Sequence, residues 1–171
     1  MATTMVEQKT VDAQKTSENL KLEITRVIRA SRQRVFDAWT RPEFVRQWFA
    51  PGNMVVHNAA TDPRVSGEYR IAVQGSTAAC EGRAEDGDVS RKVVVSGRYV
   101  KVEPYDLLSF TWKGDGDSNE ETLVTVALKD VEGGTELTLT HERFASEELR
   151  DKHEHGWASI LSKLGNLVEG N

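Results

Sequence analysis

Apolar residues recur along the chain in two rhythms, one typical of strands and one typical of helices. From Leu20 to Ile28 nearly every second residue is apolar, which predicts a strand with one buried face. Further segments with strand character follow at residues 54–60, 67–74, 92–103, 107–113, 122–129 and 135–144. Consecutive strands joined by short connections predict an antiparallel meander. The pair Gly133-Gly134 is expected to form one of its hairpin turns.

Helical spacing appears in three places. Ser31 is suited to cap a first short helix, and Pro42 is suited to open a second one. The apolar positions of these two helices are Val35, Phe36, Ala38 and Trp39, then Phe44, Val45, Trp48 and Phe49. Ser146 is suited to cap a last helix that runs to about Glu169, which is about 23 residues or roughly 35 Å.

This order of elements predicts an α+β fold. A sheet with one apolar face needs a cover, and the last helix is the only large amphipathic element that can supply it. We therefore expect a curved antiparallel sheet of about six or seven strands wrapped on the long C-terminal helix. A straight helix and a curved sheet do not close along their whole length. The gap between them is where a small-molecule site is expected.

Composition narrows the classes of function. The chain has 171 residues, with 22 Lys and Arg against 27 Asp and Glu, for a net charge of −5. This acidity gives no support to nucleic-acid binding, which needs a basic surface. Cys80 is the only cysteine, so no intramolecular disulfide forms, and no apolar run is long enough to span a membrane. The cytoplasm is the expected location.

The first residues differ from the rest of the chain. Residues 1–18 are polar and lack periodicity, so we interpret them as a flexible tail ahead of a single domain at residues 19–171. The EGRAEDGD segment at residues 81–88 predicts an acidic loop whose role the sequence does not reveal.

Four stretches of the chain resemble a known family. They are ITRVIRASRQRVFDAWTRPEFVRQWFAP at 24–51, GRYVKVEPYDLLSFTW at 97–112, VTVALKDVEGGTELTLTHERF at 124–144 and HEHGWASILSKL at 153–164. Over about residues 20–169 the chain resembles the SRPBCC superfamily, which has the START-like, helix-grip fold also seen in the birch-pollen allergen. Within it, the chain is most similar to homologues of the activator of the heat-shock-90 chaperone ATPase. The resemblance implies the helix-grip fold, but known relatives range from lipid carriers to cyclases and co-chaperones, so it does not fix a function.

Aromatic residues at inward positions are the first candidates for a ligand site. We expect aromatic, aliphatic and histidine side chains to contact a ligand. They are Trp48, Phe49, Tyr69, Phe110, Trp112, Val126, Leu139, His141, His153 and Trp157. Trp39 and Phe144 also belong to the inward aromatic set. The alternative for each ring is ordinary core packing, because large rings dominate the interior of any small domain.

Two histidines could add polar contacts to this site. His141 continues the apolar face of its strand, and His153 lies in the apolar stripe of the last helix. They could orient a ligand or exchange protons with it, or they could simply be hydrogen-bonded at the edge of the core. His155 is expected on the opposite, solvated face, so HEHGW lacks the i, i+4 spacing of a zinc motif.

Metal and cofactor motifs give no support for catalysis. Asp115, Asp117 and Asn119 imitate the start of a calcium loop, but Gly and Glu are missing at its sixth and twelfth places. Nucleophile, phosphate-loop and dinucleotide motifs are also missing. We therefore assign no catalytic residue, metal or cofactor.

Three functions remain. The leading hypothesis is a protein that binds a small, largely hydrophobic molecule between sheet and helix and acts as a monomer or weak homodimer. The second is a stress-response module that binds a heat-shock-90-type chaperone. The third is an enzyme of cyclase or dehydratase type that uses the same cavity.

Overall fold

The computed structural model describes residues 20–75, 91–114 and 121–169. The expectations for the tail at 1–18, for Cys80, for the acidic segment 81–88 and for the calcium-like residues at 115–119 lie outside these ranges.

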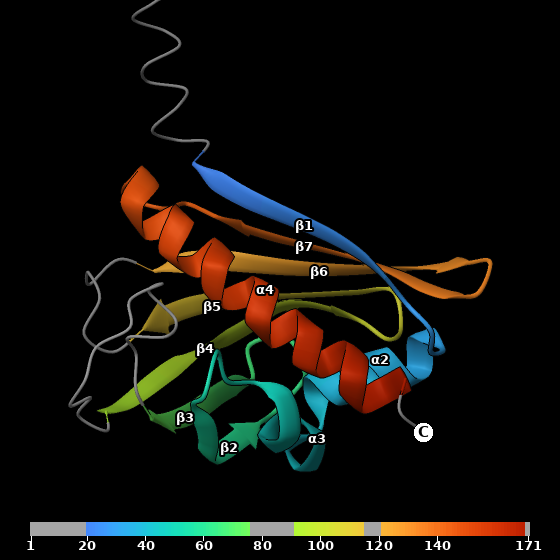
Figure 1. Cartoon of the computed structure of the whole chain (residues 1–171), viewed down its shortest axis with the longest axis horizontal. Coiled ribbons are helices and arrows are strands. Elements are labelled where there is room, and N and C mark those ends of the chain that lie inside the picture. Colours follow the sequence, from blue (N-terminus) through green and yellow to red (C-terminus); the bar gives the residue numbers. More distant parts are fainter. Residues whose placement is uncertain (1–19, 76–90, 115–120, 170–171) are drawn as a thin grey trace, which may run out of the picture.

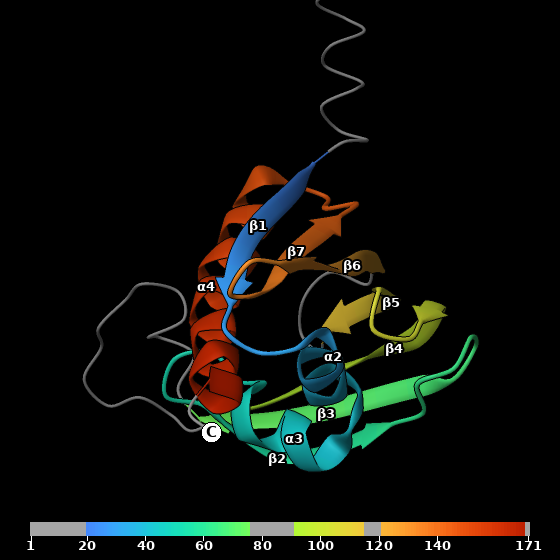
Figure 2. The ribbon, with the colours of Figure 1, turned by 90° about the vertical axis from the view of Figure 1, so that its right-hand side faces the viewer.

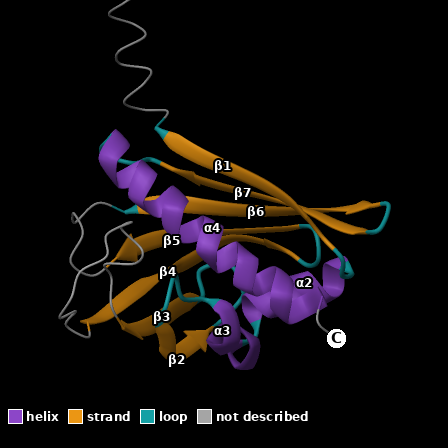
Figure 3. Ribbon diagram, viewed as in Figure 1, coloured by secondary structure: helices purple, strands orange, loops and turns teal. Residues whose placement is uncertain are grey.

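Seven strands form one antiparallel sheet (Figures 1 and 3). They are β1 (Lys21–Ile28), β2 (Val55–Thr61), β3 (Glu68–Gly75), β4 (Arg91–Glu103), β5 (Leu107–Gly114), β6 (Thr122–Val131) and β7 (Gly134–Glu142). Their order across the sheet is β1-β7-β6-β5-β4-β3-β2, so β2 to β7 form a meander and β1 pairs with its last strand. The predicted strands and their antiparallel arrangement are confirmed.

Within the described ranges the helices are α2 (Arg32–Thr40), α3 (Pro42–Trp48) and α4 (Glu147–Glu169). The caps are those that the sequence predicts. The Ser31 hydroxyl accepts a hydrogen bond from the Arg34 amide at 3.2 Å, and Ser146 accepts one from Leu149 at 3.2 Å. Pro42 is the first residue of α3, where its missing N–H costs no helical bond.

The long helix lies across the concave face of the sheet (Figures 1 and 2). Figure 2 shows the sheet curving from β1, beside α4, round to β2, with α2 and α3 filling the open end. The helix buries Trp157, Ile160, Leu161, Leu164 and Val168 against the inward residues of the strands. This is the predicted helix-grip architecture. No helix in the described part of the chain is long and apolar enough to cross a membrane.

The hairpin between β6 and β7 differs from its prediction by one residue. Val131 pairs with Gly134, so the two turn residues are Glu132 and Gly133. Gly134 already belongs to β7 and has a φ of 154°. A Cβ there would lie 2.1 Å from the carbonyl oxygen of Ile28, so the close approach of β1 requires this glycine.

Candidate ligand site under the long helix

The structure brings the ten predicted site residues into one interior layer. Nine of them are buried and His153 is half-buried. Phe49, which directly follows α3, links the layers, because its ring lies 5.9 Å from that of Trp112 and 5.7 Å from that of Trp157. Sheet, short helices and long helix therefore all contribute to a single aromatic cluster.

Trp39 lies at the centre of this cluster, although the sequence did not assign it to the site. Its ring centroid lies 4.7 Å from Trp48, 6.2 Å from Phe49, 6.3 Å from Phe110 and 6.0 Å from Trp157. The signal for it was its place on the apolar face of the first short helix. Tyr99 is a second addition, with its ring 5.6 Å from Tyr69. It follows the inward alternation of β4, where the sequence predicted only a strand.

The hollow that these rings line is small. A void of about 10 Å³ is lined by Trp39, Phe49, Thr61, Tyr69, Ile71, Tyr99, Leu108 and Phe110. That is about the space of one water molecule, whereas sites for drug-sized ligands occupy about 300–1,000 Å³. The rings therefore pack as a core in this conformation, and a larger ligand needs some of them to move.

Tyrosine hydroxyls place neutral polar groups in the interior. Tyr69 donates a hydrogen bond of 2.6 Å to the carbonyl of Thr111. Burial, and to a lesser extent neighbouring Tyr99, raises the pKa of the Tyr69 phenol well above its ordinary value. Burial also raises the pKa of Tyr99, with Asp62 a smaller cause. Both phenols are thus protonated and uncharged over the physiological pH range.

His141 is held by hydrogen bonds at both ring nitrogens. Trp157 Nε1 donates to His141 Nδ1 at 3.0 Å, so the ring proton resides on Nε2. Nε2 then donates to the Thr122 hydroxyl at 2.7 Å. Burial, and secondarily the nearby His153, lowers the pKa of His141 well below its ordinary value. His141 is therefore a neutral link in the core, with no nitrogen left to exchange a proton with a ligand.

His153 has a different environment. Its Nδ1 lies 2.8 Å from the carbonyl of Leu149, one helical turn earlier, and therefore carries the proton and donates it. Its ring centroid lies 5.1 Å from that of His141. Among the described residues its Nε2 has no hydrogen-bond partner. Acid–base chemistry at this histidine pair would therefore rest on His153 alone.

The segment between α3 and β2 closes the cluster beside α4. We call residues 50–54 the cover segment. The amide of Gly52 donates to Ser159 Oγ at 2.9 Å, and Lys163 Nζ donates to the Ala50 carbonyl at 2.5 Å. Both partners come from one side of α4. These two contacts hold the segment against α4.

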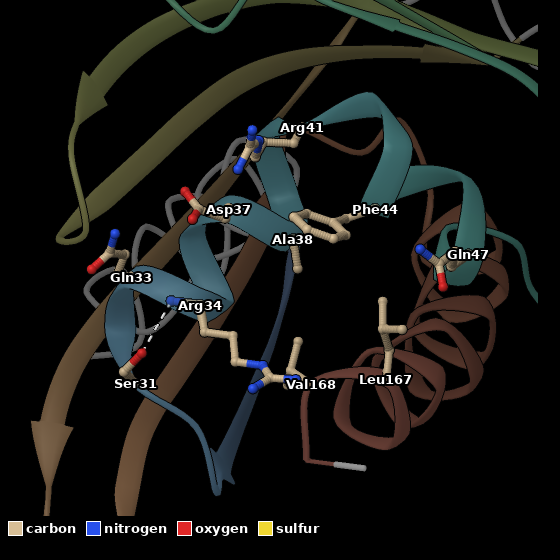
Figure 4. Close-up of a pocket in the computed structure, with 10 residues that line it drawn as sticks. All are labelled: Ser31, Gln33, Arg34, Asp37, Ala38, Arg41, Phe44, Gln47, Leu167 and Val168. Atoms are coloured by element: carbon tan, nitrogen blue, oxygen red, sulfur yellow. Dashed lines mark hydrogen bonds between the residues drawn. The ribbon is translucent and has the colours of Figure 1, made fainter. Parts of the chain in front are cut away.

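Larger hollows among the described residues lie outside the aromatic cluster. A groove of about 390 Å³ separates α2 and α3 from the end of α4, and Figure 4 shows Ala38, Phe44 and Leu167 around it. Arg34 extends across this groove towards Val168 (Figure 4). A second hollow, of about 370 Å³, lies over β3, β4 and β5 and includes Glu68, Arg70 and Arg98. Of the ten predicted site residues, only Tyr69 lines either hollow.

Metal-binding side chains do not gather in the described part of the chain. There, no group of three or more His, Cys, Asp or Glu residues is placed to hold an ion. The site is thus an apolar cluster with a few neutral polar groups.

A curved antiparallel sheet gripping a long helix over an aromatic interior defines the helix-grip class of the SRPBCC superfamily. The chain matches the family described as Activator of Hsp90 ATPase homolog 1-like protein over residues 29–169, and it belongs to that family. The fold of this family generally binds ligands in a cavity.

Solved structures share the fold. A protein from Chromobacterium violaceum is 24% identical, with 87% of this chain and 97% of that chain covered and a TM-score of 0.71. The AHSA1 protein from Silicibacter pomeroyi is 21% identical, with coverage of 87% and 97% and a TM-score of 0.70. The AHSA1-like protein from Aeromonas hydrophila is 22% identical, with coverage of 88% and 93% and a TM-score of 0.69. No curated protein matches the chain.

Proposed function

We propose that this protein binds a small, largely hydrophobic molecule between the curved sheet and α4. The observation that carries the proposal is the aromatic cluster itself, which surrounds a void and includes a buried indole N–H, that of Trp39, without an acceptor among the described residues. Apolar walls with a few convergent polar groups are typical of small-molecule sites.

Binding requires the void to enlarge. Phe49 is the residue to move, because it both lines the void and leads directly into the cover segment. Polar contacts of the segment to α4 hold this side closed, together with the buried side chains of Ala50 and Met54. An apolar cavity of about 150 Å³ is enough to bind benzene in an engineered protein, so a modest displacement creates useful space.

Tryptophan fluorescence can test the proposal directly. The chain has four tryptophans, and Trp39, Trp48, Trp112 and Trp157 all belong to the aromatic cluster. The neutral dye N-phenyl-1-naphthylamine should quench them at micromolar concentration, and native mass spectrometry should show it bound one to one. Phe49→Leu should tighten binding several-fold by enlarging the void.

Phe44→Leu is the matched control, because Phe44 lines the outer groove and not the void. Its affinity for the dye should equal that of the wild type. An affinity that changes with Phe44 and not with Phe49 would place the ligand in the outer groove. Absence of both dye binding and any co-purified small molecule would refute ligand binding under α4.

The family name supports a second candidate function, regulation of a heat-shock-90-type chaperone. Purified protein should then bind the chaperone of the same host and raise its ATPase rate. A chaperone whose ATPase rate and elution on gel filtration stay unchanged with excess protein would exclude this role. The two candidates are separable, since Phe49→Leu should change the affinity for the dye and leave any effect on the chaperone unaltered.

A further inference from the structure

Trp39 carries a hydrogen-bond donor that has no partner among the described residues. The residue is only 4% exposed, and within the described residues no acceptor reaches its Nε1. Two neighbouring indoles of the cluster do have acceptors. Trp48 Nε1 donates to the Ala38 carbonyl, and Trp157 Nε1 donates to His141 Nδ1. A buried N–H without a partner is rare and costly, so it calls for an explanation.

The described groups around Trp39 offer no strong acceptor for its indole N–H. The neighbouring groups are mainly aromatic rings, and a ring face is only a weak acceptor. Trp39 also lines the void, together with Tyr99 and Thr61. Thr61 donates its hydroxyl hydrogen to the Thr40 carbonyl at 2.7 Å, so the void has a polar side as well as an apolar one.

The lack of buried cationic side chains in the described core restricts the charge of a ligand that the void can hold. The buried core in the described ranges contains no lysine or arginine. Arg26, on the inward face of β1, bonds Ser162 at the sheet edge, and Lys163 donates to carbonyls of the cover segment. His141 is neutral, and both buried tyrosines are protonated. A carboxylate in the void would therefore be a buried charge without a counter-ion, which is strongly unfavourable.

We propose that Trp39 Nε1 anchors the bound molecule by donating a hydrogen bond to a neutral acceptor oxygen, such as a ketone, ester or ether. The ligand is thus an uncharged, largely hydrophobic compound with an acceptor at one end, and not a carboxylic acid. This assignment rests on the proposed function. It deepens it by naming the anchoring residue and the chemical class of the ligand.

Three probes of the same shape test the assignment. Cumene has no acceptor, acetophenone has a neutral ketone, and benzoate has an anionic acceptor. Their affinities for the wild-type protein and for Trp39→Phe are measured by displacement of N-phenyl-1-naphthylamine. Acetophenone should bind the wild type about three- to tenfold more tightly than cumene, as expected for one net hydrogen bond, and benzoate should bind most weakly.

Trp39→Phe keeps an aromatic ring and removes the donor. In this variant the advantage of acetophenone over cumene should vanish while cumene still binds. A nitrogen–proton NMR spectrum of the wild type gives an independent readout that needs no stable variant. The Trp39 indole proton, assigned by through-space contacts to Phe110, should move downfield with acetophenone and stay in place with cumene.

The outcomes separate the two levels of the proposal. Three results would each overturn the Trp39 assignment and leave the proposed function standing. They are equal affinities of acetophenone and cumene in the wild type, an indole proton whose chemical shift does not change with acetophenone, and benzoate binding as tight as that of acetophenone. If neither the dye nor any probe binds, the proposed function fails, and the assignment fails with it.

Discussion

At the scale of single residues, His141 couples the core to pH. Its folded-state pKa lies well below its ordinary value of 6.5, while the unfolded chain has the ordinary value. Above pH 6.5 both states are neutral and the residue adds no pH dependence. As pH falls below about 6.5, the unfolded chain takes up a proton that the folded protein does not, so the free energy of unfolding decreases.

The slope of this decrease is a testable prediction. Between pH 6.5 and 5 the free energy of unfolding should fall by up to about 1.4 kcal/mol per pH unit through His141 alone. Urea titrations at several pH values measure it. His141→Asn, which keeps an acceptor for Trp157, should flatten the slope, whereas His155→Asn, at an exposed position, should not. Parallel slopes in wild type and His141→Asn would contradict this account.

Tyr69 provides a second prediction at this scale. Its hydroxyl bonds the Thr111 carbonyl of β5, in the part of the ladder where Gly97 and Arg98 of β4 pair with β3 and not with β5. Tyr69→Phe should lower the free energy of unfolding by about 1 kcal/mol, because the part-buried Thr111 carbonyl loses its donor. Chemical denaturation measures the loss. Tyr105→Phe, 39% exposed, is the control and should change little.

The residue scale is also where prediction from sequence reaches its limit. Alternation along β7 placed His141 inside the protein, because side-chain direction follows from strand period. It did not reveal that Trp157 and Thr122 occupy both nitrogens, since those contacts join residues distant in sequence and depend on rotamers. The same limit applies to the Trp39 indole, because its lack of an acceptor among the described residues is a property of the assembled core.

At the scale of elements, two glycines differ in whether a side chain would fit at their position. Gly165 lies within α4, and nothing would lie within 4 Å of a Cβ there. Gly165→Ala should therefore raise the free energy of unfolding by about 0.5–1 kcal/mol, because glycine is the poorer helix former. Thermal and urea unfolding measure the gain. A loss of stability would mean that α4 is not continuous through this residue.

Gly97 in β4 is the opposite case. A Cβ there would lie 2.0 Å from the carbonyl oxygen of Thr111 and 2.7 Å from its hydroxyl oxygen. The backbone of β5 cannot move aside as a flexible side chain can. Gly97→Ala should therefore lower the free energy of unfolding by about 3 kcal/mol or more, or prevent folding. Circular dichroism and denaturation distinguish these results. A variant as stable as the wild type would show that β4 and β5 can separate at this point.

Element positions could be predicted well because they depend on local patterns. The period of two in β1 and the caps Ser31 and Ser146 located their elements to within a residue or two. The helix-grip assembly followed because only α4 could cover the sheet. The size of the hollow did not follow, because it depends on how closely Phe49 and the other rings pack once the elements have met.

At the scale of the whole molecule, the cover segment decides whether the interior is accessible. The segment is fixed to α4 by Ser159 and Lys163, while the strands behind it form one continuous ladder. Opening therefore needs loss of these polar contacts and exposure of the buried side chains of Ala50 and Met54, while the sheet stays intact. Such a local opening costs far less than global unfolding.

Hydrogen exchange and binding kinetics test this opening together. Ser159→Ala removes the acceptor of the Gly52 amide, so that amide should exchange about two- to tenfold faster, as expected from the loss of one net hydrogen bond. The association rate of N-phenyl-1-naphthylamine should rise in the same proportion if this segment is the entrance. Ser162→Ala is the matched control, because Ser162 lies one turn away and bonds Arg26 and the Ala158 carbonyl. It should leave both rates unchanged. Faster exchange with an unaltered association rate would show that the ligand enters elsewhere, even though the segment moves as described.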